Sequence, residues 1–566
     1  MKKIILLSLL TVYLNVNAQM TGGNGDLPVT GSIFISEIMA DPSPPVQLPE
    51  KEYLEITNRS GDTLFTGGII LIAGPDSVTL PAETIAPQEY VILCATGSRS
   101  LFAPYGRVMA IKSFPTLNND GELLALRDSD GRLLHAVSYT PAFLGEGPRS
   151  GGGWSAELTD LSNPFNEPEA WKPSVDPSGG TPGRANSSVT TAADLRCPEV
   201  VAVWTEKGDT VKVLFDETVM VVAGERWQAD GRETLPAVSG DPADRMLLVP
   251  LSQRLQKGEI LTLTVPASVT DFAGNATCQG DLRTGIPSDP MAGEILFNEL
   301  LFDPLPGGED YIEFYNNSNT VADLSSLYLS NSLTAPAIVF TAVPRQLLPY
   351  EYVAVTVDRD AVVDGYPCAS PYAVFEASRL PSMPDGGGTL ILYNRMLTVV
   401  DRVSYSSAMH QVFLSGTESI ALEKVFPALP SDVSANWHSA SEECGWGTPG
   451  AANSVAVEPA EAGAGLRLSS TRVSPDGDGF EEVVSVSVWP GGDDNIISVT
   501  VFNDRGYCVR RLAERFSAGA GATFVWDGTA DSGARLPAGL YMIMAESMSS
   551  SGVSRRWKKA CAVLYR

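Results

Sequence analysis

The sequence predicts an all-β protein built of tandem β-sandwich domains, and three observations support this. Short β-branched segments are separated by clusters of Gly, Pro, Asn and Asp, a pattern typical of sandwiches and barrels; examples are residues 32–36, 211–215, 260–265 and 497–502. Helical windows are scarce, and we expect only single turns at 98–105 and 252–257. A large unit of sequence occurs twice. With 566 residues, the chain has room for about four domains.

The N-terminus has the three parts of a secretory signal peptide. Residues 1–3 are basic, 4–14 are apolar, and a small-residue cleavage pattern ends at Ala18. The apolar stretch is too short to span a membrane, and no later apolar run reaches the roughly 20 residues that a spanning helix needs. We therefore expect a signal peptide over 1–18 and an exported protein. It would lie at the cell surface or in the medium, with the periplasm as the alternative.

Export places the 7 cysteines where disulfides are permitted. None forms a C-x-x-C pair, which excludes a zinc ribbon or a thioredoxin-type site. Pairing within each domain is the simplest arrangement, although sequence alone leaves other pairings open. This arrangement predicts the disulfides Cys197–Cys278, Cys368–Cys444 and Cys508–Cys561. Cys94 is then expected to be free and buried in an apolar strand at 90–94.

The repeat runs from about residue 31 to 187 and again from about 293 to 454. The matches keep one order through the whole unit, so they are not accidental. They are Glu37 with Glu299, E-Y-L-E-I at 52–56 with D-Y-I-E-F at 310–314, Asn58 with Asn316, P-Q-E-Y-V at 87–91 with P-Y-E-Y-V at 349–353, V-S-Y at 137–139 with V-S-Y at 403–405, Trp171 with Trp437, and G-T-P-G at 180–183 with G-T-P-G at 447–450.

These motifs, with the closing pattern G-T-P-G-x-x-N-S, resemble the lamin tail domain. The resemblance implies Ig-like β-sandwiches over 30–188 and 292–455, of the kind shared by nuclear lamins and many exported bacterial proteins. We interpret the repeated residues as structural. Glu55 and Glu313 are expected to hydrogen-bond neighbouring backbone or face solvent, and the T-P-G runs are expected to be turns.

The two remaining parts of the chain resemble other exported modules. Residues 195–286, with F-D-E-T-V at 215–219 and D-F-A-G-N at 271–275, resemble a bacterial Ig-like domain. Residues 466–566, with P-D-G-D-G at 475–479 and L-P-A-G-L-Y at 536–541, resemble the C-terminal Ig-like domain of gliding-motility or flagellar-hook-capping type in Bacteroidetes. The second resemblance implies a sorting signal for type IX secretion.

Charge is distributed unevenly along the chain. The formal net charge is −28, which argues against a general nucleic-acid partner. From Leu466 onward there are 12 Lys and Arg against 11 Asp and Glu, so the negative charge belongs to the first three domains. The last domain ends in a basic strip of Arg555, Arg556, Lys558, Lys559 and Arg566. It is interpreted as a solvated strand face, with contact to sorting machinery or an anionic surface glycolipid as the alternative.

The residues offer little for catalysis, and we expect no enzyme activity. The three histidines, His135, His410 and His438, lie in different contexts, and the zincin, nucleophile-elbow, Walker and dinucleotide motifs are missing from the sequence. One candidate metal site is calcium at Asp476, Asp478 and Glu481, where oxygen ligands gather around a Gly-rich turn; a plain turn is the alternative.

The leading hypothesis is a non-enzymatic structural, adhesive or scaffolding protein of a Bacteroidetes-like bacterium. Its partner would be an unknown surface protein or glycan, with the secretion machinery as a further partner of the last domain. The first alternative is a carbohydrate- or protein-binding accessory module that uses aromatic platforms at Trp154, Trp171, Tyr311 and Trp437. The second is a secreted hydrolase, which two facing carboxylates in a polar cleft would favour.

Overall fold

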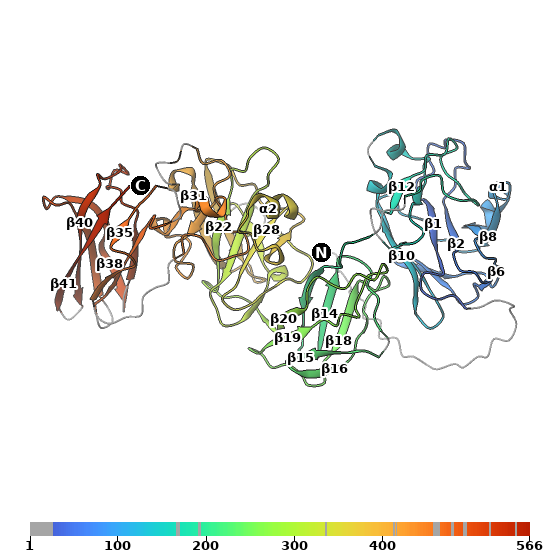
Figure 1. Ribbon diagram of the computed structural model, residues 1–566, viewed down its shortest axis with the longest axis horizontal. Helices are drawn as coiled ribbons and strands as arrows, with labels where there is room; N and C mark the ends of the chain where they lie inside the picture. The colour runs from blue at the N-terminus through green and yellow to red at the C-terminus, as the bar shows by residue number, and fades with distance from the viewer. Residues whose placement is uncertain are drawn as a thin grey trace.

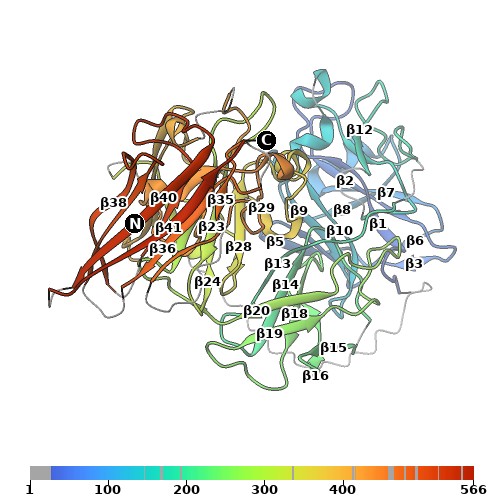
Figure 2. The same ribbon diagram turned by 60° about the vertical axis from the view of Figure 1, so that its left-hand side comes forward.

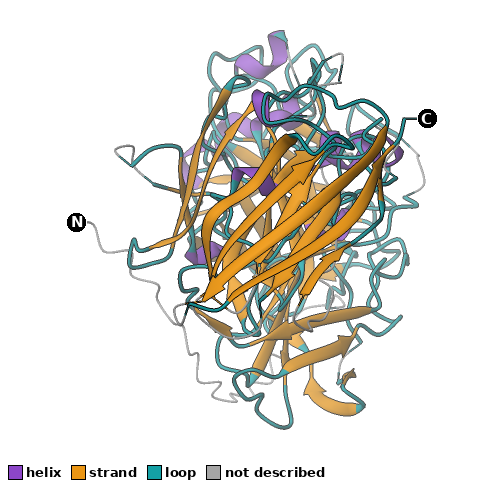
Figure 3. Ribbon diagram, turned by 90° about the vertical axis from the view of Figure 1, so that its left-hand side faces the viewer, coloured by secondary structure: helices purple, strands orange, loops and turns teal. Residues whose placement is uncertain are grey.

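The structure is a computed structural model that describes residues 27–145, 147–165, 170–190, 194–222, 224–333, 337–410, 414, 416–456, 465–476, 480–490, 495–519, 522–549 and 552–565. The predicted signal peptide, 1–18, lies outside these residues. Strands dominate the described chain, so the all-β prediction is confirmed (Figure 3). Within the described ranges, two α-helices are present, α1 (Arg99–Phe102) and α2 (Arg359–Gly365). None of the helices among the described residues is long and apolar enough to cross a membrane.

The helical turn expected at 98–105 is present as α1, but the one expected at 252–257 is wrong. The Leu255 N–H donates to the carbonyl of Gly208, and the Leu255 side chain is buried in the neighbouring core, which fixes this segment as a loop. The remaining helical elements are short 3-10 turns: η1 (Thr96–Ser98), η2 (Pro141–Leu144), η3 (Pro148–Gly151), η4 (Leu324–Ser326), η5 (Pro371–Ala373), η6 (Ser407–Met409), η7 (Ser434–Asn436) and η8 (Glu442–Cys444).

The first region, residues 27–190, is a sandwich of a six-stranded sheet, β12-β11-β1-β2-β7-β8, and a four-stranded sheet, β10-β9-β4-β5. Its core lies between the two sheets and includes Ile35, Leu71 and Trp171. The strands are β1 (Ile33–Met39), β2 (Tyr53–Asn58), β3 (Leu64–Phe65), β4 (Ile70–Ala73), β5 (Asp76–Thr79), β6 (Thr84–Ile85), β7 (Tyr90–Ala95), β8 (Arg107–Ile111), β9 (Glu122–Arg127), β10 (Leu133–Tyr139), β11 (Ala156–Leu158) and β12 (Trp171–Pro173).

The second region, residues 194–286, is a smaller sandwich of two four-stranded sheets, β13-β14-β18-β17 and β16-β15-β19-β20. Alternation explains its strands: Val211, Val213 and Phe215 of one strand point into the core, while the residues between them are only partly buried. The strands are β13 (Val200–Trp204), β14 (Thr210–Phe215), β15 (Arg226–Ala229), β16 (Arg232–Pro236), β17 (Val238–Ser239), β18 (Met246–Pro250), β19 (Ile260–Thr264) and β20 (Asp281–Gly285).

The third region, residues 287–456, repeats the sheets of the first strand for strand. Its six-stranded sheet has the order β29-β28-β23-β22-β32-β33, and its four-stranded sheet has the order β26-β25-β30-β31. A third, small sheet is β21-β24-β27. The strands are β21 (Pro287–Ser288), β22 (Ile295–Leu301), β23 (Tyr311–Asn316), β24 (Val321–Asp323), β25 (Tyr328–Ser330), β26 (Ile338–Val339), β27 (Gln346–Leu347), β28 (Tyr352–Thr356), β29 (Val374–Glu376), β30 (Gly387–Tyr393), β31 (Val399–Ser406), β32 (Leu422–Lys424) and β33 (Trp437–Ser439).

The fourth region, residues 465–565, packs a three-stranded sheet, β34-β36-β39, against a five-stranded sheet, β35-β41-β40-β37-β38. The long strands of the second sheet lie in front in Figure 3. The strands are β34 (Gly465–Leu468), β35 (Arg472–Val473), β36 (Val484–Trp489), β37 (Asn495–Phe502), β38 (Cys508–Gly519), β39 (Ala522–Trp526), β40 (Gly539–Ser549) and β41 (Ser554–Val563).

The four regions follow one another in chain order along the molecule, with the second displaced to one side (Figures 1 and 2). Pairing between named strands stays inside each region as defined here. The exact domain boundaries proposed from the sequence stay a prediction.

Candidate functional site

Each copy of the repeat buries three glutamates side by side on its six-stranded sheet. In the first region, Glu37 of β1 pairs with Glu55 of β2 on one side and Glu157 of β11 on the other. All three are fully buried, at 0% exposure. We call this set the first trio. A run of buried carboxyl groups is costly unless each finds hydrogen-bond donors, so the donors define the site.

Many of the donors come from the closing segment of the first region, residues 180–188, alongside the hydroxyls of Ser36 and Ser155. The Thr181 N–H donates to Glu37 at 2.6 Å, and the Thr181 hydroxyl donates to Glu157 at 2.8 Å. The Gly183 N–H donates to Glu55 at 2.6 Å. The Ser187 hydroxyl and the N–H of the next residue donate to Glu157 at 2.8 and 2.7 Å. The closing segment therefore holds all three carboxyl groups at once.

The third region repeats this arrangement, and we call Glu299, Glu313 and Glu423 the second trio. Its closing segment is residues 447–455. The Thr448 N–H and hydroxyl donate to Glu299 and Glu423, both at 2.9 Å, and the Gly450 N–H donates to Glu313 at 2.7 Å. Tyr311 donates to Glu299 at 2.7 Å, as Tyr53 donates to Glu37 at 2.9 Å. The repeated sequence motif is thus a repeated hydrogen-bond network.

The two glycines of the closing motif are required by space and by backbone conformation. A Cβ on Gly180 would lie 2.6 Å from the Tyr53 hydroxyl and 2.7 Å from Glu37. Gly183 has a φ of +81°, a conformation that side chains other than glycine adopt only at a cost. Glycine at both places lets the backbone approach the carboxyl groups closely enough to donate its N–H groups.

Burial raises the pKa of Glu37 and Glu55 in the first trio and of all three members of the second. It raises the pKa of Glu37 to about 7, helped by the neighbouring charge of Glu157, and raises the pKa of Glu299 to about 8, helped by Glu423. Burial also raises the pKa of Glu423 to about 7. For Glu55, burial and then the charge of Glu37 raise the pKa well above the ordinary value. Sealed from solvent, such groups act as fixed hydrogen-bond partners for the closing segment.

A β-bulge beside each trio frees one backbone N–H, and the opposite sheet accepts it. The pairing of β1 with β2 shifts between Ile35 and Glu37, and the Ile35 N–H donates to Nδ1 of His135 at 3.2 Å. In the third region the Phe297 N–H donates to Asp401 at 2.8 Å. His135 is fully buried, and burial lowers its pKa to about 4, so it accepts this bond as a neutral ring. His135 is therefore a structural residue.

The interpretation of Glu55 and Glu313 as structural agrees with this geometry, and the T-P-G runs do form turns. The alternative that these two glutamates face solvent is wrong, since both are fully buried. Sequence reasoning missed Glu157 and Glu423. Their signal is an acidic residue at the same place in both copies of the repeat, directly after the apolar residues Ala156 and Leu422.

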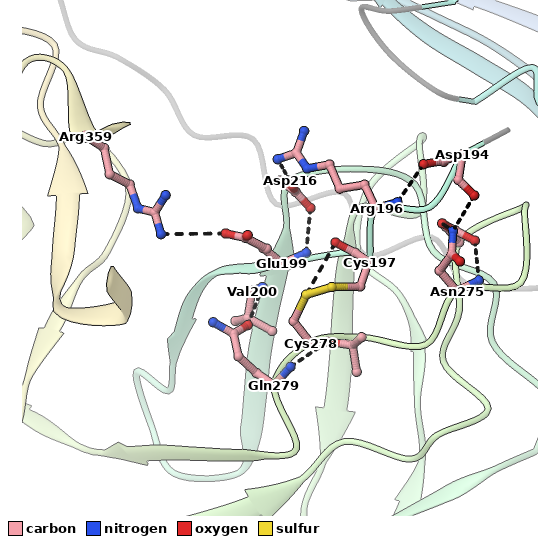
Figure 4. The surroundings of a disulfide bond; sticks show 12 residues. Asp194, Arg196, Cys197, Glu199, Val200, Asp216, Asn275, Cys278, Gln279 and Arg359 are labelled. Carbon is pink, nitrogen blue, oxygen red and sulfur yellow. Dashed lines mark hydrogen bonds and ion pairs between the residues drawn. A yellow bond between two sulfur atoms is a disulfide. The ribbon is translucent and has the colours of Figure 1, made fainter. Parts of the chain in front are cut away.

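Two of the three predicted disulfides are formed. Cys197 is joined to Cys278 in the second region, as Figure 4 shows, and Cys368 is joined to Cys444 in the third. The first fastens the segment before β13 to the segment before β20. The second fastens the segment after α2 to η8, three residues before the closing segment. Cys94 is free and buried in β7, as expected.

The predicted disulfide Cys508–Cys561 is wrong, because both residues are free. Cys508 is exposed on β38, and Cys561 is buried on β41. Two strands, β37 and β40, lie between them in the sheet. Three inter-strand spacings amount to roughly 14 Å, whereas a disulfide needs Cα atoms within about 7 Å.

The predicted calcium ligands do not all fall within the described chain, because Asp478 lies outside it. Glu481 forms an ion pair with Arg472 at 3.0 Å and accepts a hydrogen bond from Ser470 at 2.9 Å. Asp476 accepts a hydrogen bond from Ser474 at 3.0 Å. Calcium at this turn stays a prediction. A calcium titration followed by melting temperature tests it, and no shift with calcium or chelator would count against it.

Another acidic group lies where the first region meets the second. Ligand oxygens of Asp194, Glu217 and Asp271 all lie within 4.8 Å of one another. Asn275 donates to Asp271 at 2.7 Å, and Asn163 of the first region donates to Asp194 at 2.9 Å. Burial, followed by the charges of neighbouring aspartates, raises the pKa of Glu217 to about 8. This is an oxygen donor set of the kind hard cations bind.

The junction between the first and second regions is built from direct contacts. The Arg127 guanidinium pairs with Asp244 at 2.5 Å and donates to the carbonyl of Asp241 at 3.0 Å. Phe165 packs against Phe272, with ring centres 5.1 Å apart. A charged and an apolar contact thus fix the same junction.

At the junction between the second and third regions, a single residue, Ile286, separates β20 from β21, the first strand of the third region. β21 pairs in parallel with β24, and Gln346 bonds both the carbonyl of Gly285 at 2.8 Å and the Thr284 hydroxyl at 2.8 Å. Two ion pairs flank this contact, Arg283–Glu351 and Arg359–Glu199; the second, at 3.8 Å, is drawn in Figure 4.

The third and fourth regions meet at an apolar cluster in which Val425 and Val455 pack with Val483 and Val525. Beside it lies a cavity of about 430 Å³ lined by His410, His438 and Asp527, among others. Burial, with the neighbouring His438, lowers the pKa of His410 to about 4. Both histidines are buried side chains of this junction.

The aromatic residues considered as ligand platforms are mostly in the core. Trp171, Tyr311 and Trp437 are 1%, 0% and 5% exposed, so they present no face to a ligand. Trp154 is partly buried, and the Arg149 guanidinium lies 5.1 Å from its ring centre.

The basic strip of the last region is exposed at Arg555, Arg556, Lys558 and Lys559, while Arg566 lies outside the described residues. Arg556 forms an ion pair with Glu546 on the neighbouring strand. Three of its members form no ion pair within the described chain: Arg555, which donates to the carbonyl of Pro490, and Lys558 and Lys559.

Comparison with known proteins gives no family. The chain matches no protein-family model and no curated protein. Among solved structures it is similar to domains 1–6 of the surface layer protein SbsC, with 12% identity, a TM-score of 0.15, and coverage of 66% of this chain and 55% of that one. For dimeric latent PorU from Porphyromonas gingivalis, the values are 11% identity, a TM-score of 0.15, and coverage of 70% and 35%. A tetra-tandem repeat from the extending region of a large adhesion protein gives 12% identity, a TM-score of 0.13, and coverage of 94% and 99%. The chain thus spans about half the length of the first structure and about a third of the second, and none matches its whole arrangement.

Proposed function

We propose that the protein is a non-enzymatic scaffold or adhesion protein, exported to the cell surface or the medium, whose β regions form a spacer of fixed shape. The observation that carries this proposal is that every junction between consecutive regions is built from specific contacts. The strongest is the second, where β21 joins the small sheet of the third region and Gln346 bonds across the junction. Rigid junctions favour a chain that holds its ends at a set distance.

The buried trios support the same proposal. Facing carboxylates would favour a hydrolase if they lay in a polar cleft, but these lie sealed beneath closing segments and bond to backbone. Their position suits a structural role in each sandwich.

Small-angle X-ray scattering of the mature chain tests the rigid spacer. We expect one narrow distribution of interatomic distances that is insensitive to moderate salt. Arg127→Ala combined with Gln346→Ala should broaden it by loosening two junctions, and Arg402→Gln, at an exposed position of β31, serves as the control. A wild-type distribution as broad as that of the double variant would contradict the proposal.

We also propose that the signal peptide exports the chain and that the fourth region directs type IX secretion. Support comes from the sequence of residues 1–18 and from the resemblance of the last domain. Deleting residues 466–566 tests the second point. Loss of surface or medium delivery is expected, and unchanged delivery would overturn the sorting role.

A further inference from the structure

A groove of about 550 Å³ lies between the second and third regions. Its second-region wall is formed by β13 and by the segment leading into β20, and its third-region wall includes Arg345 and Tyr372. A groove of this size is within the range of small-ligand sites. It is separate from the trios and from the predicted calcium turn.

Arg283 and Arg345 line this groove, Arg359 lies near Arg345, and Arg345 alone of the three lacks a counter-ion within the described chain. Arg283 pairs with Glu351, and Arg359 pairs with Glu199. The Arg345 side chain makes no hydrogen bond or ion pair with any residue in the described ranges. Its donors therefore remain available to a group that enters the groove.

Arg345 is nevertheless held in place. Its guanidinium carbon lies 5.1 Å from the centre of the buried Phe375 ring, a cation–π contact that restrains the position of the guanidinium. Burial, with the charge of Arg359, lowers the pKa of Arg345 to about 10, so it stays cationic at neutral pH. A positioned guanidinium with open donors matches a carboxylate, which accepts two parallel hydrogen bonds.

The other walls favour a sugar ring behind that carboxylate. The Tyr372 side chain is 60% exposed at the groove, so its ring is open for stacking. Gln279 accepts the Val200 N–H at 2.6 Å through Oε1 (Figure 4), which leaves its amide Nε2 as a donor toward hydroxyl groups. An aromatic face, an amide donor and a guanidinium together suit a ring that carries hydroxyls and one acid group.

We propose that this groove binds an acidic saccharide, with Arg345 holding the carboxylate and Tyr372 lying against the ring. This goes beyond the scaffold role and does not depend on it. An acidic peptide offers the same carboxylate without the hydroxylated ring, and it is one outcome of the test.

The test is calorimetric titration of the full mature chain with trigalacturonate, with its methyl ester as the uncharged match. We expect the acid to bind at least about tenfold more tightly than the ester, as one bidentate charged pair provides. Arg345→Gln should remove that difference, and Tyr372→Ala should weaken both sugars several-fold. Arg402→Gln, an exposed arginine on another sheet, should change nothing.

Three results would overturn the proposal: no binding of trigalacturonate, equal binding of acid and ester, or binding that Arg345→Gln leaves unchanged. Arg345-dependent binding of tetraglutamate that is tighter than that of trigalacturonate would overturn the saccharide assignment in favour of an acidic peptide. Circular dichroism checks folding. If Arg345→Gln fails to fold, Arg345→Lys keeps the charge and removes the bidentate fork, and we expect about the same loss of affinity.

Discussion

The two copies of the repeat share their sheets and their trios but differ in the contacts that support them. The first copy meets the second region through Arg127, where the third region has Tyr393 at the matching place on its sheet. The second copy receives β21 from the incoming chain and a disulfide beside its closing segment. The sheets and the trio networks are thus kept, while the contacts to neighbouring regions and the disulfide differ.

The largest effect is expected from removing the central carboxyl of each trio. Glu37→Ala and Glu299→Ala leave several buried donors without an acceptor, at about 1–3 kcal/mol each, so a loss of about 3–5 kcal/mol is expected. Hydrogen exchange should rise more in the closing segment of the first copy than in that of the second, because the second keeps the disulfide Cys368–Cys444 nearby. Hydrogen exchange of residues 180–188 and 447–455, read by mass spectrometry, measures both.

The matched variants Glu37→Gln and Glu299→Gln keep the acceptor oxygen and are expected to change exchange little. Equal damage by Ala and Gln would contradict a hydrogen-bonding role for the trios. Equal opening of the two copies in the Ala variants would show that the disulfide does not support the closing segment.

The next effect comes from the disulfide that only the second copy has. Cys368→Ser with Cys444→Ser frees a loop of 76 residues, and chain entropy predicts a loss of about 4 kcal/mol in the third region. Native-state proteolysis of the first and third regions should show faster cutting of the third alone. Cys508→Ser, at an exposed free thiol, is the control.

A smaller effect is a pH dependence of stability that is expected in the second copy of the repeat and comes from Lys424. Lys424 is fully buried where the first copy has Leu158, and burial lowers its pKa to about 7. A lowered pKa means that the folded chain binds fewer protons than the unfolded chain between pH 7 and 10.5. Stability attributable to Lys424 should therefore rise with pH, by about 2 kcal/mol from pH 7 to pH 9.

Lys424→Met isolates that effect. The difference in unfolding free energy between wild type and variant, taken by urea titration at each pH, cancels the contribution of the trios. Lys424 donates to the carbonyls of Pro427 and Leu429 at 2.7 and 2.5 Å, so the variant also loses a pH-independent amount. A difference that is flat from pH 7 to pH 9 would contradict the prediction.

The smallest effect concerns the acidic group at the first junction. The pKa of Glu217 is raised to about 8, so ionising it costs stability as pH rises from about 4.5 to 8. Glu217→Gln should stabilise the junction at pH 8 by about 1 kcal/mol, after allowance for screening by solvent. At pH 4 wild type and Glu217→Gln should have the same melting temperature. A stabilisation of equal size at pH 4 would argue for a packing effect instead.

Much of the fold was predictable because it depends on local pattern. The alternation in β14 and the ordered matches of the repeat indicate strands and two equal sandwiches, and both are present. The trio networks were not predictable, because Glu37 and Thr181 lie 144 residues apart, and nothing in either segment specifies the other. The predicted disulfide Cys508–Cys561 is wrong for a related reason. Both cysteines lie in one domain, but the strand order of its sheet separates them.

The position of β21 has a practical consequence for anyone who isolates the third region. A fragment begun at residue 292, the boundary suggested by the sequence, lacks Pro287 and Ser288, which pair with Val321 and Ala322. The cut would uncover those two side chains, each only 2% exposed in the intact chain, and leave an open backbone edge on β24. A fragment begun at or before Pro287 keeps the strand and should be the better-behaved one to crystallise.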